Sequence, residues 1–205
     1  MKKLKSKVAL HCSHMPKSAV SELLDICSRE DWLANMLMSA FSSVSSSTAE
    51  RAPLKSSGIV KPVVVKKPWG LEIIGPVVRQ QVGSATEGYA QKILVVSGSL
   101  SLQAHYPYKN ERGKLHHAKV ESQTVLYGEL ILGLGQRKTG KSACAKKITL
   151  KPGQTYHIAA GTVHQPMSSK GGLAIILEVS LPNVGPGSTR RIYDPWNTTR
   201  SRKDM

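Results

Sequence analysis

The chain has 205 residues, 40% of them hydrophobic and 20% charged, which suffices for one substantial core. These proportions exclude a collagen-like, coiled-coil or wholly disordered protein, and no apolar run approaches the ~18 residues of a membrane-spanning helix. The net charge of +16 is spread along the chain and favours anionic partners in general. The absence of a long apolar run leads us to expect a soluble protein. Three cysteines without CxxC spacing argue against a disulfide framework and a thiolate zinc site, so we expect a reducing compartment, the cytoplasm.

The first 41 residues combine a basic segment with a helical pattern. Residues 1–17 contain several lysines and no acidic side chain, so we expect a solvated basic tail in which His11 and His14 face water. Organelle-import signals also begin without acids, but they favour arginine where this chain has lysine; import is the alternative to a cytoplasmic location. From residue 17 to residue 41, apolar residues recur at helical spacing, which predicts one amphipathic helix or two helices broken near Ser28 to Asp31.

A serine-rich linker and a long β-rich block follow. Residues 42–58, SSVSSSTAERAPLKSSG, are poor in core-forming side chains and predict a linker. Beyond them, short segments such as YAQKILVVS, VESQTVLYGELILGLG and GGLAIILEVSL are punctuated by glycine and proline, with no helical run between them. Such segments predict an antiparallel sandwich or barrel, so we expect three parts: the helical segment 1–41, the linker 42–58 and one all-β domain over 59–205.

Three of the predicted strands carry side chains that can hold one metal ion. Gln103 and His105 point the same way because side chains alternate along a strand. Glu121 can face the same interior from a later strand, and His164 follows two glycine turns that bracket a third strand. Nitrogen and oxygen ligands from three strands predict a solvent-accessible site suited to Zn²⁺, Mn²⁺ or Fe²⁺.

The order of several short motifs resembles the cupins, and within them the sugar-phosphate isomerases of the mannose-6-phosphate isomerase type. The motifs lie within residues 61–200 and are KPWGLE (67–72), LSLQAH (100–105), VLYGEL (125–130), LKPGQTYHIAAGTVH (150–164), LEVSLP (177–182) and RRIYD (190–194). The resemblance implies a cupin double-stranded β-helix, a jelly-roll barrel, here preceded by an N-terminal helical extension. It also implies a bound divalent metal, zinc first with manganese or iron as alternatives, and dimerisation through a sheet edge.

Carried over residue by residue, the family's metal ligands fall on Gln103, His105, Glu121 and His164. The second ligand has alternatives, because the family's histidine lies close before the glutamate, whereas sixteen positions separate His105 from Glu121. The intervening loop resembles an insertion, so His116 or His117 can take this role instead. We favour His105, since its position relative to Gln103 follows from strand alternation.

The same resemblance implies an aldose–ketose isomerase, which moves a proton between adjacent carbons of a sugar phosphate. The metal acts as a Lewis acid on the sugar oxygens, and a general base takes the carbon-bound proton. Lys119 is the candidate base by its position two residues before Glu121. Arg191 matches the arginine of the family's terminal motif and is the expected phosphate ligand, with Arg190 and Lys92 as further cationic candidates.

A second class of function stays open beside the enzyme. The inserted loop, the charge of +16 and the helical extension fit a cupin without turnover, a binding or structural module of a larger assembly, including one that contains RNA. No basic segment is interleaved with stacking aromatic side chains, so no motif indicates a nucleic-acid reader. Candidates at every ligand position favour the enzyme, and metal content discriminates between the two readings.

Overall fold

The computed structural model describes residues 2–42, 63–82, 85–109, 115–116, 118–135, 144–181 and 189–193. The helices of this part are α1 (Lys2–His11), α2 (Lys17–Arg29) and α3 (Asp31–Ser42). The strands are β1 (Val63–Lys67), β2 (Gly70–Val82), β3 (Ala85–Val96), β4 (Leu102–His105), β5 (Tyr108–Lys109), β6 (Leu115–His116), β7 (Val120–Tyr127), β8 (Leu130–Gly135), β9 (Lys146–Leu150), β10 (Thr155–Ile158), β11 (Val163–Ser168), β12 (Ala174–Leu181) and β13 (Thr189–Tyr193). Most of the predicted linker, 42–58, lies outside the described residues, so the division into three parts stays a prediction.

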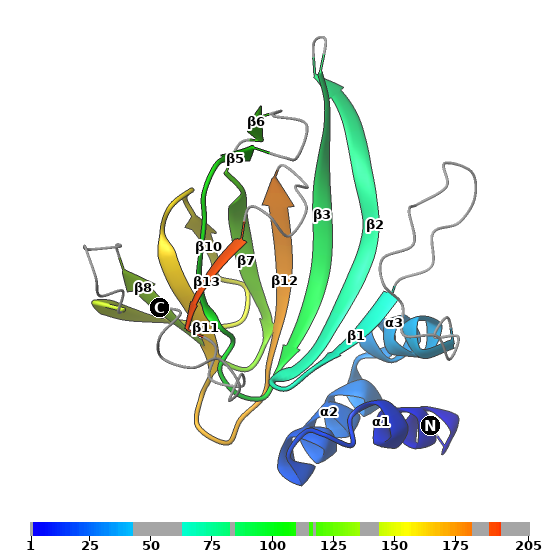
Figure 1. Ribbon diagram of the computed structural model, residues 1–205. Coiled ribbons are helices and arrows are strands. Elements are labelled where there is room, and N and C mark those ends of the chain that lie inside the picture. Colours follow the sequence, from blue (N-terminus) through cyan, green and yellow to red (C-terminus); the bar gives the residue numbers. More distant parts are fainter. Residues whose placement is uncertain are drawn as a thin grey trace.

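The longer strands form two antiparallel sheets that enclose a barrel (Figure 1). One sheet has the order β1-β2-β3-β12-β7-β10 and the other the order β13-β4-β11-β8-β9, while β5 and β6 pair with each other. In both sheets a late strand is inserted between two early ones, β12 between β3 and β7 and β11 between β4 and β8. This double interleaving is the strand order of a jelly roll. The predicted all-β class, a double-stranded β-helix or jelly-roll barrel preceded by helices, is confirmed.

The predicted basic tail is a helix, which corrects the expectation from the sequence. α1 places Leu4 and Val8 one turn apart, and both are buried together with His11. The His11 ring stacks on the Phe41 ring of α3, with centroids 4.4 Å apart. The prediction that His11 faces water is therefore wrong, because a helix turns this side chain onto an apolar partner that is remote in the sequence. His14 is exposed, as predicted.

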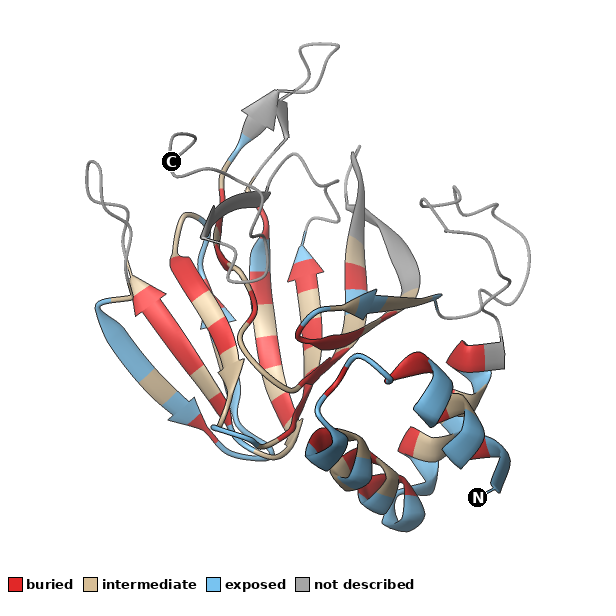
Figure 2. Ribbon diagram, turned by 60° about the horizontal axis from the view of Figure 1, so that its bottom comes forward, coloured by how far each residue is buried: buried red, intermediate tan, exposed pale blue. Residues whose placement is uncertain are grey.

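The rest of the helical pattern forms two helices, which confirms that alternative. α2 ends at Arg29 and α3 begins at Asp31, within the predicted break. The apolar sides of the helices pack against one sheet, as Figures 1 and 2 show. Their cluster joins Leu23, Leu33 and Leu37 of the helices to Leu71, Ile73, Val95, Leu173 and Ile175 of the barrel. This part of the sheet is consequently covered on both of its faces.

The barrel interior is apolar at one end and polar at the other. Along β7 the inward positions change from Glu121 and Gln123 to Val125, and all three are buried. Val125 belongs to an apolar cluster that includes Ile176 and Trp69, which is 8% exposed. Buried polar side chains need partners inside the protein or from a ligand. The polar end of the barrel is therefore where the fold positions a site.

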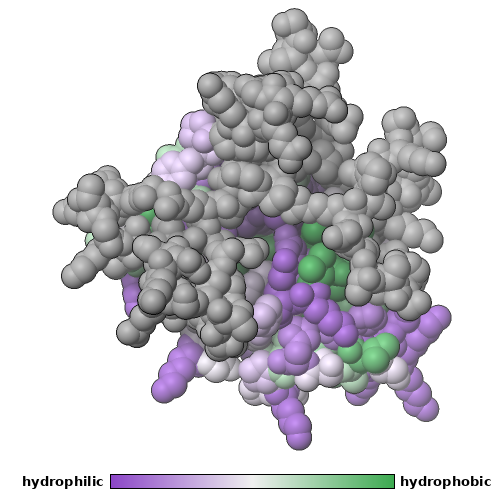
Figure 3. Space-filling view, in the orientation of Figure 1, coloured by the Kyte–Doolittle hydropathy of each residue, from purple (hydrophilic) through white to green (hydrophobic). Residues whose placement is uncertain are grey.

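On the face shown in Figure 3, the described residues that are visible are mainly hydrophilic, with small hydrophobic patches. No helix in the described part of the chain is long and apolar enough to cross a membrane. The large apolar side chains that are exposed are Leu10, Trp32, Val63, Val120 and Leu181.

Candidate metal centre

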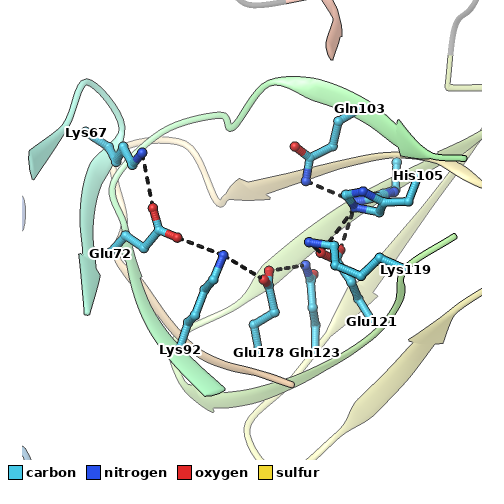
Figure 4. Close-up of polar contacts among 10 residues, drawn as sticks. Lys67, Glu72, Lys92, Gln103, His105, Lys119, Glu121, Gln123 and Glu178 are labelled. Carbon is cyan, nitrogen blue, oxygen red and sulfur yellow. Dashed lines mark hydrogen bonds and ion pairs between the residues drawn. The ribbon is translucent and has the colours of Figure 1, made fainter. Parts of the chain in front are cut away.

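Three buried side chains from both sheets meet inside the polar end of the barrel. His105 ends β4 and His164 lies on β11, which are neighbours in one sheet, while Glu121 projects from β7 in the other sheet. One ligand atom from each residue lies within 4.8 Å of the other two. The exposed fractions are 2% for His105, 2% for Glu121 and 0% for His164. Figure 4 shows this group with its polar neighbours.

Local backbone geometry explains how the two imidazoles reach this point. Gln103 and His164 are partners in the register between β4 and β11, so they lie side by side on the inner face. Before β11 the chain makes a turn in which Gly161 has a φ of +78°, a left-handed conformation that favours glycine. The backbone N–H of Gly161 donates a hydrogen bond of 2.8 Å to the carbonyl oxygen of His105. This bond holds the end of β4 next to the start of β11.

The carboxylate of Glu121 lies between the histidines. Its Oε1 is 3.2 Å from Nε2 of His105, and its Oε2 is 3.1 Å from Nε2 of His164. The ammonium of Lys119 also contacts Oε1. Both oxygens are buried but receive no well-directed hydrogen bond, even though these neighbours are close. A buried carboxylate in this condition is expected to gain from a further positive partner.

The protonation states suit a cation. Burial alone raises the pKa of Glu121, but His105, His164 and Lys119 outweigh it and hold the pKa well below its usual range. Burial lowers the pKa of His105, and the positive charge of Lys119 lowers it further, against the opposing effect of Glu121. The site therefore combines an ionised carboxylate with a neutral imidazole, the forms that bind metals.

The tautomer of His164 also fits a metal ligand. Its Nδ1 lies 3.0 Å from the carbonyl oxygen of Thr162, which can only accept, so Nδ1 carries the proton. When the ring is neutral, the lone pair of Nε2 faces the interior, where the side-chain amide of Gln103 lies 3.3 Å away. A flip of that amide presents its oxygen at the same place. A hydrogen-bonded Nδ1 that orients Nε2 is the usual support of a metal-binding histidine.

The structure thus brings Gln103, His105, Glu121 and His164 together, with Lys119 beside them. Nitrogen and oxygen donors around buried, poorly satisfied carboxylate oxygens fit a divalent metal such as Zn²⁺, Mn²⁺ or Fe²⁺. The choice between His105 and the alternative ligands His116 and His117 stays a prediction, because His117 and the side chain of His116 lie outside the described residues.

The candidate phosphate ligands are placed only by their backbone. β13 pairs with β4, and Arg191 lies opposite Gln103 while Arg190 lies opposite Ala104. The side chains of both arginines lie outside the described residues. Their strand nevertheless adjoins the strand that carries two candidate metal ligands.

A row of charged and polar side chains next to the metal ligands was missed by the sequence patterns, apart from Lys92. Two members, Gln123 and Glu178, are buried, and the others, Lys67, Glu72 and Lys92, are partly exposed. Lys67 Nζ lies 3.1 Å from Glu72 Oε2, and Lys92 Nζ lies 2.8 Å from Glu72 Oε1 and 3.6 Å from Glu178 Oε1. The amide of Gln123 donates to Glu178 Oε2 over 3.3 Å, and its own oxygen is buried without a hydrogen-bond partner. Figure 4 shows the row crossing β1, β2, β3, β12 and β7. An acid inside the apolar run LAIILEVSL was the available signal.

Charge balance within the row is set by burial and pairing. Burial and the negative charge of Glu121 raise the pKa of Glu178. Burial opposes the charged form of Lys92, but Glu178 and Glu72 outweigh it and raise the pKa of this lysine. Burial likewise opposes the charge of Glu72, yet Lys92 and Lys67 hold its pKa below the usual value. The charge on each of these side chains therefore depends on its neighbours, and the row ends beside the metal ligands.

Comparison with known proteins gives resemblances of fold at low similarity. No protein-family model and no curated protein matches the chain. A protein from Klebsiella pneumoniae with a double-stranded β-helix domain is 20% identical, with 57% of this chain and 80% of that chain covered and a TM-score of 0.37. The mannose 6-phosphate isomerase from Bacillus subtilis is 25% identical, with 52% of this chain and 37% of that chain covered and a TM-score of 0.40.

An oxalate oxidase in complex with glycolate is 18% identical, with 51% of this chain and 46% of that chain covered and a TM-score of 0.37. This chain therefore spans less than half the length of either enzyme that it matches. The fold assignment accordingly rests on the strand order, and the candidate metal centre rests on its own geometry.

Proposed function

We propose that this chain is a metal-dependent cupin that interconverts an aldose phosphate and a ketose phosphate, in the manner of mannose-6-phosphate isomerase. The observation that carries the proposal is the convergence of His105, Glu121 and His164 inside the barrel, next to a lysine and the row of charged and polar side chains. Gln103, His105, Glu121 and His164 would hold the metal, with zinc proposed as the ion. When bound there, a divalent ion supplies Lewis acidity that favours negative charge developing on the sugar oxygens.

The chain's own residues supply the remaining functions. Lys119 reaches the metal ligands from the same face as Glu121, and we assign it the transfer of the proton between the two carbons. The row of charged and polar side chains next to it offers donors and an unsatisfied acceptor, the amide oxygen of Gln123, to sugar hydroxyls. Arg191 is proposed to bind the phosphate, because a guanidinium can bond two phosphate oxygens at once and its strand adjoins the strand of Gln103 and His105.

Metal content tests the site first. The protein is stripped with a chelator, reloaded with Zn²⁺, desalted and analysed for metal, together with Glu121→Ala and His164→Ala. We expect one zinc per chain in the wild type and more than about 100-fold weaker binding in both variants, which each lose a ligand. Glu129→Ala and His157→Ala are matched controls, because both residues are exposed, and they should retain the metal.

Turnover is then measured with mannose 6-phosphate in an assay coupled to the removal of fructose 6-phosphate. We expect activity in the loaded wild type, and its loss in Glu121→Ala, His164→Ala and Lys119→Met. Absence of zinc under these conditions contradicts the metal centre. Stoichiometric zinc without turnover contradicts the isomerase and favours the cupin that serves as a binding module.

A further inference from the structure

Lys119 occupies a position that a bound cation also needs. Its ammonium contacts Oε1 of Glu121, and that same oxygen faces Nε2 of His105 at 3.2 Å. Lys119 is 8% exposed and Glu121 is 2% exposed, so water screens this contact weakly. The ammonium thus supplies the positive charge at the centre of the candidate ligands.

Within the described chain, Glu121 is the carboxylate that pairs with Lys119, while Glu72 and Glu178 pair with different lysines. Without Lys119, the ion pairs of Glu121 among the described residues would be those with the two imidazoles. A divalent ion held by Glu121, His105 and His164 would meet an ammonium on one of its own ligand atoms. Two positive charges this close in a weakly screened interior repel strongly, so both cannot stay in place.

The backbone next to Lys119 permits the displacement. β7 begins at Val120, so residues 118 and 119 lie before the strand and take no part in its ladder. The strand pairing keeps Glu121 fixed opposite Ser180 and Ile158. Lys119 can therefore leave Glu121 without breaking a ladder hydrogen bond, whereas the carboxylate cannot follow it.

We propose that Lys119 is a built-in competitor of the metal: it neutralises Glu121 in the metal-free protein and must be displaced from this carboxylate when a divalent cation binds. The inference rests on the metal centre of the proposed function. Lys119 thereby weakens metal binding, because the incoming divalent ion must replace the Lys119 ammonium at the carboxylate of Glu121 and does not find this carboxylate unpaired.

The test is a titration of the full-length protein with Zn²⁺ against a chromophoric chelator, in phosphate-free buffer at one fixed pH. The proteins are the wild type, Lys119→Met, Lys119→Arg and the control Lys170→Met, which removes an exposed lysine from the turn between β11 and β12. We expect Lys119→Met to bind Zn²⁺ at least tenfold more tightly than the wild type, about 1.4 kcal/mol. Lys119→Arg, which keeps the charge, and Lys170→Met should both stay within about threefold of the wild type.

A gain of affinity separates competition from damage, because a disturbed site binds metal more weakly. Equal or weaker binding by Lys119→Met, when the wild type binds Zn²⁺, overturns the inference and leaves the proposed metal centre intact. Absence of binding in both proteins overturns the two together. Lys119→Gln replaces the methionine variant if circular dichroism shows that the latter is unfolded.

Discussion

The substitution Lys92→Met should destabilise the metal-free protein at pH 8. It removes the ammonium that lies 2.8 Å from Glu72 and 3.6 Å from Glu178, while methionine retains most of the side-chain volume. At an effective dielectric constant of about 20, these contacts correspond to attractions of about 6 and 5 kcal/mol, part of which offsets desolvation. Lys67 still pairs with Glu72 over 3.1 Å, so the loss falls mainly on Glu178, whose side chain is 5% exposed.

Removing one partner of a buried ion pair costs about 3 to 5 kcal/mol; because the Lys92 side chain is 23% exposed and another lysine remains, we expect about 3 kcal/mol here. For a domain of this size that corresponds to a fall in Tm of about 6 to 12 °C. The assay is urea unfolding in the presence of EDTA, followed by circular dichroism, with the exposed Lys147→Met as the control.

The pH dependence of this loss identifies its cause. Burial and Glu121 already raise the pKa of Glu178, and Lys92, followed by Lys119, opposes this rise. An acid with a raised folded-state pKa binds protons more readily when folded, so stability rises as pH falls from that pKa toward the unfolded value. The difference between wild type and Lys92→Met should therefore shrink from pH 8 to pH 5, and adding Glu178→Gln should recover more than half of it. A Lys92→Met protein as stable as the wild type at pH 8, or a difference that does not depend on pH, would refute this reasoning.

Three further substitutions or treatments test other parts of the fold. Leu37→Ala should cost about 2 to 5 kcal/mol in urea unfolding, because this leucine is 0% exposed between the helices and the sheet; a loss below 1 kcal/mol would contradict that packing. Gly128→Ala should destabilise more than Gly153→Ala: both glycines have positive φ, but an added Cβ at Gly128 would lie 1.9 Å from a backbone oxygen and the space at Gly153 is open. Burial raises the pKa of Cys12 to about 12 and of Cys27 to about 11, so both thiols should resist iodoacetamide at pH 8 until urea unfolds the protein; rapid labelling of the native chain would contradict their burial.

The short, regularly punctuated segments without a helical run between them predicted an antiparallel sandwich or barrel, and the motif resemblance narrowed this to a jelly roll. Strand alternation likewise placed Gln103 beside His105, and the turn before β11 located His164. The helix α1 was missed because its lysines suggest a solvated tail, whereas its burial depends on Phe41, which is remote in the sequence. Local patterns carry no information about such a partner.

The row of charged and polar side chains could not be predicted, because its contacts also join residues that are remote in the sequence. Glu72, Lys92 and Glu178 come from different strands, and their contacts depend on the register of β2 on β3 and of β3 on β12. Each residue alone is an ordinary charged side chain. Only the sheet order, which inserts a late strand between early ones, shows that the three meet.

The position of the N-terminal helices has a practical consequence for anyone who trims the protein. A truncated protein beginning at β1 would lack the helices that cover Leu71, Ile73, Val95 and Ile175, and these residues would form an exposed apolar surface on the outside of the sheet. Surfaces of this kind cause chains to stick to one another. We therefore expect that the smallest fragment that does not aggregate in solution includes the helices. The barrel expressed alone is expected to form inclusion bodies.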